Sequence, residues 1–192
     1  MTVMVLCLTQ DPEADALLTR SPLALLVGML LDQQIRMESA FVGPAKLLER
    51  LGHLDPASIA AMDPEAFGAV MAARPAVHRF HASMGQRIQA LCRVIADDYG
   101  SDASQLWAGV ATGEELLARV QALPGFGHQK AQIFVALLGK RLAVRPKGWR
   151  AAAGPYGDRQ FRSVADVTSQ ESIRKVRAFK QAVKAEAKPV KN

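Results

Sequence analysis

The chain is poor in cysteine, with only Cys7 and Cys92 among its 192 residues. An iron–sulfur cluster takes four protein ligands, so two cysteines exclude one. Both cysteines have apolar neighbours in the sequence, and we expect them to behave as small buried hydrophobic side chains. The four histidines, at positions 53, 78, 81 and 128, show no metal-ligand spacing.

Long hydrophobic runs are also missing. The longest apolar run, Leu23 to Leu31, is well short of the roughly 20 residues that span a bilayer. The N-terminus has no basic segment and reaches Asp11, Glu13 and Asp15 early, which is unlike a signal peptide. We therefore expect a cytoplasmic protein with no membrane partner.

Acidic residues are scarce in the C-terminal segment, residues 141–192. The net charge is +6, but residues 1–140 carry −3 and residues 141–192 carry +9. A basic segment on a near-neutral body predicts a polyanionic partner, although such segments are also common as solvated tails. At 49% hydrophobic content, the chain is typical of a folded globular protein.

Alternating strand patterns are absent between the predicted helices. Four helix starts share a capping side chain directly before a proline: Asp11-Pro12, Ser21-Pro22, Asp55-Pro56 and Asp63-Pro64. Two capping boxes are predicted, from Thr112 to Glu115 and from Thr168 to Glu171. Hydrophobic periodicity predicts an all-α fold, with helices at 12–19, 22–35, 38–51, 56–61, 64–72, 79–99, 103–109, 113–122, 128–139 and 170–186.

Two segments fall outside this helical pattern. Residues 3–8 fit either a short strand or an extended packed arm. Residues 139–167 hold several prolines and glycines, which predict a long loop with one helical turn near Trp149. A loop of this length in a compact domain is usually functional or disordered, and Trp149, Tyr156 and Phe161 argue against disorder.

The most informative stretch is Leu123-Pro124-Gly125-Phe126-Gly127-His128-Gln129-Lys130, which lies between two predicted helices. Glycine suits a turn with positive φ or a close approach of another backbone. Gly127 also opens a helix, whose unpaired N–H groups form a small anion socket. An ordinary turn between two helices is the alternative interpretation.

The order L-P-G-hydrophobic-G-x-x-[KT]-A resembles the helix-hairpin-helix of the HhH-GPD base-excision DNA glycosylase superfamily. This resemblance implies that the amides of Gly125, Phe126 and Gly127 grip a DNA phosphate. It also implies a monovalent cation, K⁺ or Na⁺, on the carbonyls of Gln121, Leu123 and Phe126, with no other cofactor required. The implied partner is duplex DNA with a damaged or mismatched base, bound by a nucleoid-associated monomer.

The resemblance further implies two helical lobes with a cleft between them. One lobe is expected to be a bundle of residues 27–140 that carries the hairpin. The other is expected to join residues 1–26 to the basic segment 141–192. The family pattern covers roughly residues 22 to 145 and is lost beyond them.

A second match lies about 90 residues before the hairpin, in Leu30-Leu31-Asp32-Gln33-Gln34. The two glutamines fit a simple helix cap. In adenine-mismatch and alkylation glycosylases, however, a Gln-Gln pair follows an apolar helix, and one glutamine fills the space that a flipped nucleotide leaves. The resemblance assigns this wedge role to Gln34, with Gln33 second. Base flipping costs a few kcal/mol, which makes such a wedge necessary.

A third match is Met84-Gly85-Gln86-Arg87-Ile88-Gln89-Ala90-Leu91, which resembles the family pattern G-x-[KR]-x-x-x-[LI]. Just before it, four basic side chains surround Pro75. They form either a solvated loop or a contact with the DNA backbone: Arg74, His78, Arg79 and His81.

The hairpin departs from the family at the position of the Schiff-base lysine, which is Gln129 here. Lys130 follows one residue later, about 100° around the helix, where we expect it to reach a phosphate or solvent. A lysine-based strand cleavage is therefore not expected.

A second departure concerns the family's catalytic aspartate, which follows a short hydrophobic segment some 20 residues after the hairpin. Here Leu142-Ala143-Val144 is followed by Arg145, and no Asp or Glu occurs from 116 to 157. A carboxylate stabilises the positive charge that develops on the sugar, a task for which arginine has the wrong sign. We interpret Arg145 as a DNA-binding residue.

Three other carboxylates are candidates for the missing catalytic group. Asp32 comes first because it adjoins the glutamine pair, Asp158 second, and Asp166, which fits a helix-initiating residue, third. Trp149 and Tyr156 are candidates for stacking a flipped base, although a structural role for either is equally consistent with the sequence.

The leading hypothesis is a monofunctional DNA N-glycosylase without lyase activity. The alternative is a catalytically silent DNA-binding or lesion-recognition protein on the same scaffold. A third hypothesis, an unrelated helical interaction module, requires both hairpin glycines to be replaceable without effect on DNA affinity.

Overall fold

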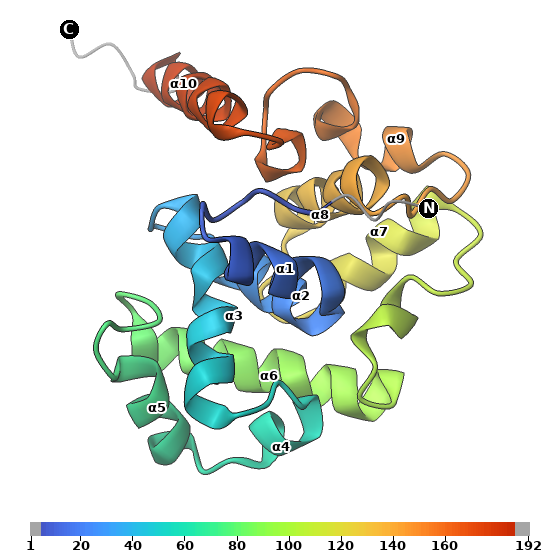
Figure 1. Ribbon diagram of the computed structural model, residues 1–192. Coiled ribbons are helices and arrows are strands. Elements are labelled where there is room, and N and C mark those ends of the chain that lie inside the picture. Colours follow the sequence, from blue (N-terminus) through green and yellow to red (C-terminus); the bar gives the residue numbers. More distant parts are fainter. Residues whose placement is uncertain (1–4, 187–192) are drawn as a thin grey trace, which may run out of the picture.

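The computed structural model describes residues 5–186 and contains only helices and connecting segments (Figure 1). This confirms the all-α prediction. One isolated β-bridge joins Thr112 and Lys147, and no strand occurs among the described residues. The helices are α1 (Pro12–Arg20), α2 (Pro22–Leu31), α3 (Met37–Leu51), α4 (Pro56–Ala61), α5 (Pro64–Ala72), α6 (His81–Tyr99), η1 (Ala103–Leu106), α7 (Gly113–Gln121), α8 (His128–Arg141), α9 (Trp149–Ala152), η2 (Gly154–Gly157), η3 (Val164–Asp166) and α10 (Gln170–Glu186).

The four capping residues before prolines act as predicted. The side chains of Asp11, Ser21, Asp55 and Asp63 each accept a hydrogen bond from a backbone N–H in the first turn of the helix that follows. These local signals place the starts of α1, α2, α4 and α5.

The two predicted capping boxes are wrong in detail. Thr112 accepts from the N–H of Glu115, but the Glu115 carboxylate returns to Ala111, one residue too early for a box. At α10 the capping side chain is Ser169 instead of Thr168, since Ser169 Oγ accepts from the N–H of Ser172. A true box occurs at η3, between Ser163 and Asp166, which confirms Asp166 as a helix-initiating residue.

The centre of the molecule is α2, in which every residue from Leu23 to Leu31 is buried. Helix α2 packs on α1 and α3, and α6 packs on α4 and α5. The α7–α8 hairpin packs against α9, η2 and η3, which confirms the helical turn at Trp149 and shows that the predicted long loop is largely helical turns. The two-lobe division at residues 27 and 140 stays a prediction.

The chain before α1 is an extended arm over the described residues, 5 to 8. It is held by side chains of α1, because the N–H of Leu6 donates to Thr19 Oγ1 and that of Leu8 to Asp15 Oδ1. The start of the predicted segment, residues 3 and 4, lies outside the described residues. The prediction for Cys7 is wrong, since this thiol is exposed on the arm, whereas Cys92 is buried.

No single helix between residues 5 and 186 has the length and hydropathy to cross a membrane. Helices α1 and α2 together reach the required length and composition, but they meet at a bend of 115°.

Candidate active site

The candidate site forms around the C-terminal end of α2. The last carbonyls of a helix lack intrahelical partners. Here the Nζ of Lys130 donates to the carbonyl oxygens of Met29 at 2.8 Å and Leu30 at 3.1 Å. The side-chain amide of Gln33 also donates to Leu30 at 2.8 Å. Two sequence motifs about 100 residues apart therefore meet at one helix end.

The helix stops at Leu31, four residues earlier than predicted, so the glutamine pair lies on a turn. Gln33 is held on three sides: beyond its bond to α2, its Oε1 accepts from Arg87 at 2.9 Å and its carbonyl oxygen is 3.1 Å from His78 Nε2. Gln34 is exposed and has φ of +58°, a left-handed conformation. The turn thus presents Gln34 outward on a braced support, which is compatible with a wedge, and the wedge role stays a prediction.

His78 is buried and braces this turn, so its predicted place on a DNA-facing basic loop is wrong. Its Nδ1 accepts from the N–H of Phe80 at 3.0 Å, which leaves Nε2 to carry the proton that it donates to the Gln33 carbonyl. Burial lowers the pKa of His78 below its usual value, against the opposing effect of the backbone hydrogen bonds. Burial thus favours the neutral form of the native imidazole.

The hairpin packs directly on the same end of α2. Gly125 has φ of +81°, and a Cβ at this position would stand 2.3 Å from Leu30 Cδ1. Phe126 is buried and packs edge-to-face on Phe134, with ring centroids 5.9 Å apart. The positive φ of Gly125 and its contact with Leu30 explain why glycine is needed there, and the packing on Phe134 explains the aromatic side chain of Phe126.

No packing contact among residues 5–186 requires a glycine at position 127. Its φ of −67° suits any residue, and a Cβ there would meet nothing within 4 Å. It is the N-cap residue of α8 and offers no side-chain cap, and the exposed residues Gly127, His128 and Gln129 carry the first N–H groups of this helix. A glycine with open space in front of uncapped amides leaves room for a ligand to approach, as the anion-socket prediction requires.

The carbonyls assigned to a cation come from this turn. The N–H of Phe126 donates to the Leu123 carbonyl at 3.1 Å, which leaves one lone pair of that oxygen available. The Gln121 side chain contacts His128 Nδ1 at 3.0 Å, which draws together the two helices that flank the turn. These residues are compatible with a cation, which stays a prediction.

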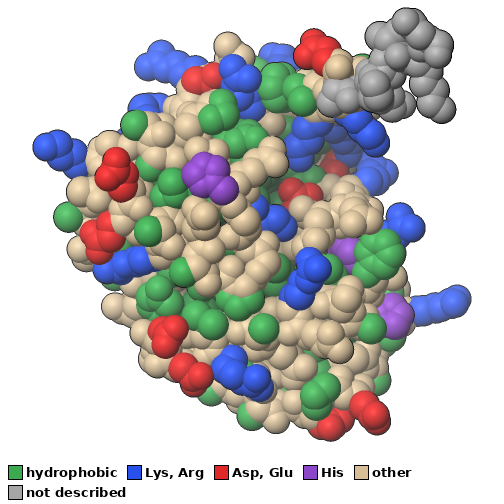
Figure 2. All heavy atoms as spheres, turned by 180° about the vertical axis from the view of Figure 1, so that it is seen from behind, with side chains coloured by type: hydrophobic (Ala, Val, Ile, Leu, Met, Phe, Trp, Pro, Cys, Tyr) green, Lys and Arg blue, Asp and Glu red, His purple; other side chains and the backbone are tan. Residues whose placement is uncertain are grey.

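Asp32 lines a cleft of about 200 Å³ between the α2–α3 turn and α10. The opposite wall is formed by Ile173, Val176, Arg177 and Lys180 of α10. Figure 2 shows a hollow near the C-terminal end of the chain, with Lys and Arg side chains on its rim and acidic side chains inside it. Burial raises the pKa of Asp32, while the positive charges of Lys180 and Lys130 oppose that rise.

The basic rim of this cleft was not predicted residue by residue. Arg177 pairs with Glu38, whose second carboxylate oxygen is buried without a hydrogen-bond partner among the described residues. Arg177 and Lys180 belong to the basic C-terminal segment, and the net charge of that segment is the one feature of the sequence that indicates a basic surface here. The sequence alone does not show which of its cations face Asp32.

The predicted outward orientation of Lys130 is wrong. Its ammonium is turned inward to α2, and burial lowers its pKa while Asp32 opposes that effect. At the neighbouring position, Gln129 Nε2 donates to the hydroxyl of Tyr156 at 2.7 Å. At the position that carries the nucleophilic lysine in lyase members, this chain has Gln129, whose side-chain amide is hydrogen-bonded to the Tyr156 hydroxyl.

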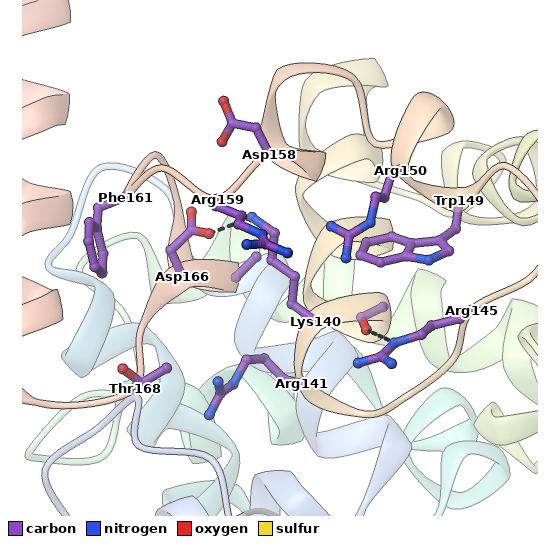
Figure 3. A pocket seen from close by; sticks show the side chains of 12 residues that line it. Lys140, Arg141, Arg145, Trp149, Arg150, Asp158, Arg159, Phe161, Asp166 and Thr168 are labelled. Atoms are coloured by element: carbon purple, nitrogen blue, oxygen red, sulfur yellow. Dashed lines mark hydrogen bonds and ion pairs between the residues drawn. The ribbon is translucent and has the colours of Figure 1, made fainter.

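Four other candidates gather at the opposite end of α8, around a pocket of about 250 Å³ (Figure 3): Arg145, Trp149, Asp158 and Asp166. Arg145 and Asp158 line it, and Asp158 pairs with Arg162 at 2.8 Å. Because α8 spans 14 residues, its ends are about 20 Å apart. The structure therefore does not bring Asp158 or Arg145 to the glutamine turn.

Trp149 lines the same pocket but cannot stack a base. A Cβ at Gly139 would stand 2.3 Å from its ring, so one face is covered, and the Arg150 guanidinium lies 4.6 Å from the ring centroid on the indole. Its residue is 8% exposed. The prediction for Trp149 as part of a base pocket is wrong, while that for Tyr156 stays a prediction.

Comparison with known proteins agrees with this geometry. The family model of the HhH-GPD superfamily of base excision DNA repair proteins matches residues 27–191. The chain belongs to this superfamily, which makes it a base excision repair protein with a DNA substrate, in a group that comprises DNA glycosylases. No curated protein matches the chain.

Proposed function

We propose that the protein is a monofunctional DNA N-glycosylase that flips a damaged or mismatched base and releases it by hydrolysis. The observation that carries this proposal is the convergence on the end of α2. Gly125 packs on Leu30, Lys130 and Gln33 donate to the same carbonyl, and Asp32 opens into the adjacent cleft. The residues to which we assign the phosphate grip, the wedge and the catalytic carboxylate therefore lie around one helix end.

Each part has a distinct task. The open amides in front of Gly127 bind a backbone phosphate, which positions the duplex without reading its sequence. Gln34, exposed on the braced turn, fills the gap that the extruded nucleotide leaves. A cation on the carbonyls of the hairpin would strengthen the phosphate grip by its charge.

Asp32 is the carboxylate that we assign to the chemical step. The bond between C1′ of the sugar and the base nitrogen breaks, and its electron pair leaves with the base. The Asp32 carboxylate stabilises the positive charge that develops on the sugar and accepts a proton from the water that attacks C1′. Lys130 and Lys180 favour the ionised carboxylate that this task needs.

Gln129 determines the class of glycosylase. An amide cannot form a Schiff base with C1′, and Lys130 is occupied by the α2 carbonyls. The reaction therefore ends with an abasic site in an intact strand.

The test is base release by the purified protein from duplex oligonucleotides that carry alkylated purines, uracil, hypoxanthine, or adenine opposite an oxidised guanine. Strand breaks are scored with and without hot alkali. We expect breaks after alkali only. Breaks without alkali would establish a lyase and overturn the monofunctional assignment. Tight binding without release would establish a recognition protein, the function that Arg145 at the aspartate position favours.

A further inference from the structure

The pocket at the C-terminal end of α8 takes no part in the proposed reaction. Its cationic side chains come from three segments. Lys140 and Arg141 end α8, Arg145 follows it, and Arg150 and Arg159 come from α9 and the segment after η2. In Figure 3 the Arg150 and Arg159 side chains extend toward Lys140, so these charges point into one space.

The two acidic residues of this pocket are already saturated. Asp166 pairs with Lys140 at 2.5 Å and accepts from the N–H groups of Arg162 and Ser163. Asp158 pairs with Arg162 and accepts from the N–H of Gln160 at 2.8 Å. These carboxylates therefore cannot neutralise the remaining cations of the pocket.

Three guanidiniums stay uncompensated. Among residues 5–186, Arg145, Arg150 and Arg159 have no carboxylate partner. In addition, the Nε of Arg141 is buried without a hydrogen-bond acceptor. Clustered like charges repel, and a buried donor without an acceptor is costly, so this arrangement favours an external anion.

The C-terminal dipole of α8 explains only part of the cluster. Cations near the last carbonyls of a helix are stabilised there, which accounts for Lys140 and Arg141 and for Arg145, whose Nε donates to the Gly139 carbonyl at 2.8 Å. Arg150 and Arg159 belong to other segments and reach the same space. Arg150 is held within the protein, because its Nη1 donates to the Gly157 carbonyl at 3.1 Å and its guanidinium lies on the Trp149 ring. Arg159 is therefore the cation whose place in this pocket no contact among residues 5–186 explains.

We propose that this pocket is a second phosphate-binding site, separate from the hairpin. Planar guanidiniums bind phosphate oxygens in pairs, and several of them together match a multiply charged group. The volume of about 250 Å³ lies below the roughly 300 to 1,000 Å³ of sites for drug-sized ligands. This volume suits a phosphate group better than a whole cofactor.

That phosphate has two sources, the DNA backbone and a free phosphorylated small molecule. The site lies about 20 Å from the hairpin, the length of α8, so a duplex would have to reach both ends of this helix. The proposal does not depend on whether the protein hydrolyses a glycosidic bond.

The test uses Arg159→Gln, because Arg159 is exposed and makes no side-chain hydrogen bond within the described part of the chain. Arg20→Gln, an exposed charge on α1 outside the pocket, is the matched control. Calorimetric titration with pyrophosphate is expected to show binding that Arg159→Gln weakens about tenfold, the size of one charge-assisted hydrogen bond. Arg20→Gln is expected to bind like the unmodified protein, and thermal melting checks that both variants fold.

A second arm measures binding to an undamaged duplex over a range of salt. If the phosphate comes from DNA, Arg159→Gln lowers the slope of log affinity against log salt by about one, and Arg20→Gln does not. Weakened pyrophosphate binding with an unchanged slope identifies a free phosphate compound. A changed slope specific to Arg159→Gln, with or without pyrophosphate binding, identifies the backbone. Unchanged values in both arms overturn the proposal.

Discussion

The Nζ of Lys130 lies 3.1 Å from the carbonyl oxygen of Leu30, across 100 residues of sequence. Through this contact the start of α8 is fixed to the end of α2, so the hairpin and the glutamine turn form one unit. The same carbonyl also accepts from Gln33, which belongs to the turn itself. The distance between the proposed phosphate grip and the proposed wedge is therefore set by the contact of Lys130 with the end of α2.

Replacing Lys130 by methionine is expected to destabilise the fold. The variant keeps the apolar stem but leaves the Met29 and Leu30 carbonyls without their cationic donor, at a cost of about 1–3 kcal/mol. Urea unfolding measures this change. Lys147→Met, at an exposed side chain, is the control and is expected to stay within about 0.5 kcal/mol. Equal losses in both variants would contradict the role assigned to Lys130.

The two hairpin glycines are expected to respond differently to alanine. Gly125→Ala places a Cβ against Leu30 at a residue with positive φ, and we expect a loss of about 1–3 kcal/mol of stability. Gly127→Ala meets open space, and the poorer N-cap preference of alanine is expected to cost less than about 1 kcal/mol of stability. The new methyl group stands in front of the amides instead, and duplex affinity is expected to fall about tenfold for any sequence.

Fluorescence anisotropy with two duplexes of unrelated sequence checks the effect of Gly127→Ala on binding, and urea unfolding checks stability. Unchanged affinity in Gly127→Ala would contradict a phosphate contact at the hairpin amides and reduce the hairpin to a turn between α7 and α8. Sequence-dependent loss would also contradict phosphate contact.

Local signals account for what the sequence predicts well. Each Asp-Pro or Ser-Pro cap involves neighbours within three residues, so Asp11, Ser21, Asp55 and Asp63 mark real helix starts. The capping box predicted at Thr168 is wrong because an adjacent residue competes with it. Ser169, the next residue, accepts from the N–H of Ser172 and provides the cap instead. Local patterns identify candidates, and competition between adjacent candidates is decided by packing.

Contacts between distant residues account for what the sequence did not predict. The helical period correctly separates Lys130 from Gln129, but it does not show that the end of α2 lies on the Lys130 side. Trp149 was ambiguous because its residue type suits both stacking and packing. Gly139 and Arg150, which both pack on its ring, come from different elements.

His78 is expected to make stability dependent on pH. Burial lowers the pKa of the native imidazole, so the unfolded chain binds more protons below about pH 6.5. The contribution of His78 is complete above that pH and is lost as the pH falls from 6.5 toward the lowered native pKa. Urea unfolding at pH 7.5 and pH 5 measures this loss.

His78→Gln is expected to flatten this pH dependence, since the titrating group is gone, while it weakens the brace on Gln33 at both pH values. The control is His81→Gln, at an exposed residue on the first turn of α6. A pH dependence that persists in His78→Gln would assign the effect to another group.

Asp32→Asn is expected to abolish base release and to leave duplex binding intact, because it removes the carboxylate charge but keeps the shape of the side chain. Asp158→Asn is the matched control, because it makes the same substitution at the opposite end of α8, where the carboxylate is paired with Arg162. Base release is expected to persist in this variant. Single-turnover base release and anisotropy measure the two effects. The reverse pattern would move the catalytic role to Asp158.

The pH profile adds an independent check on the ionised form of Asp32. Burial raises its pKa above 3.8, so the rate is expected to fall as the pH drops through that raised value. Lys180 is the positive charge that most opposes the rise in the pKa of Asp32. Lys180→Met removes this charge, so it is expected to raise the pKa of Asp32 further and to move the acidic limb of the rate profile to higher pH. An acidic limb that stays in place in Lys180→Met, with base release retained, would show that a group other than Asp32 titrates in the chemical step.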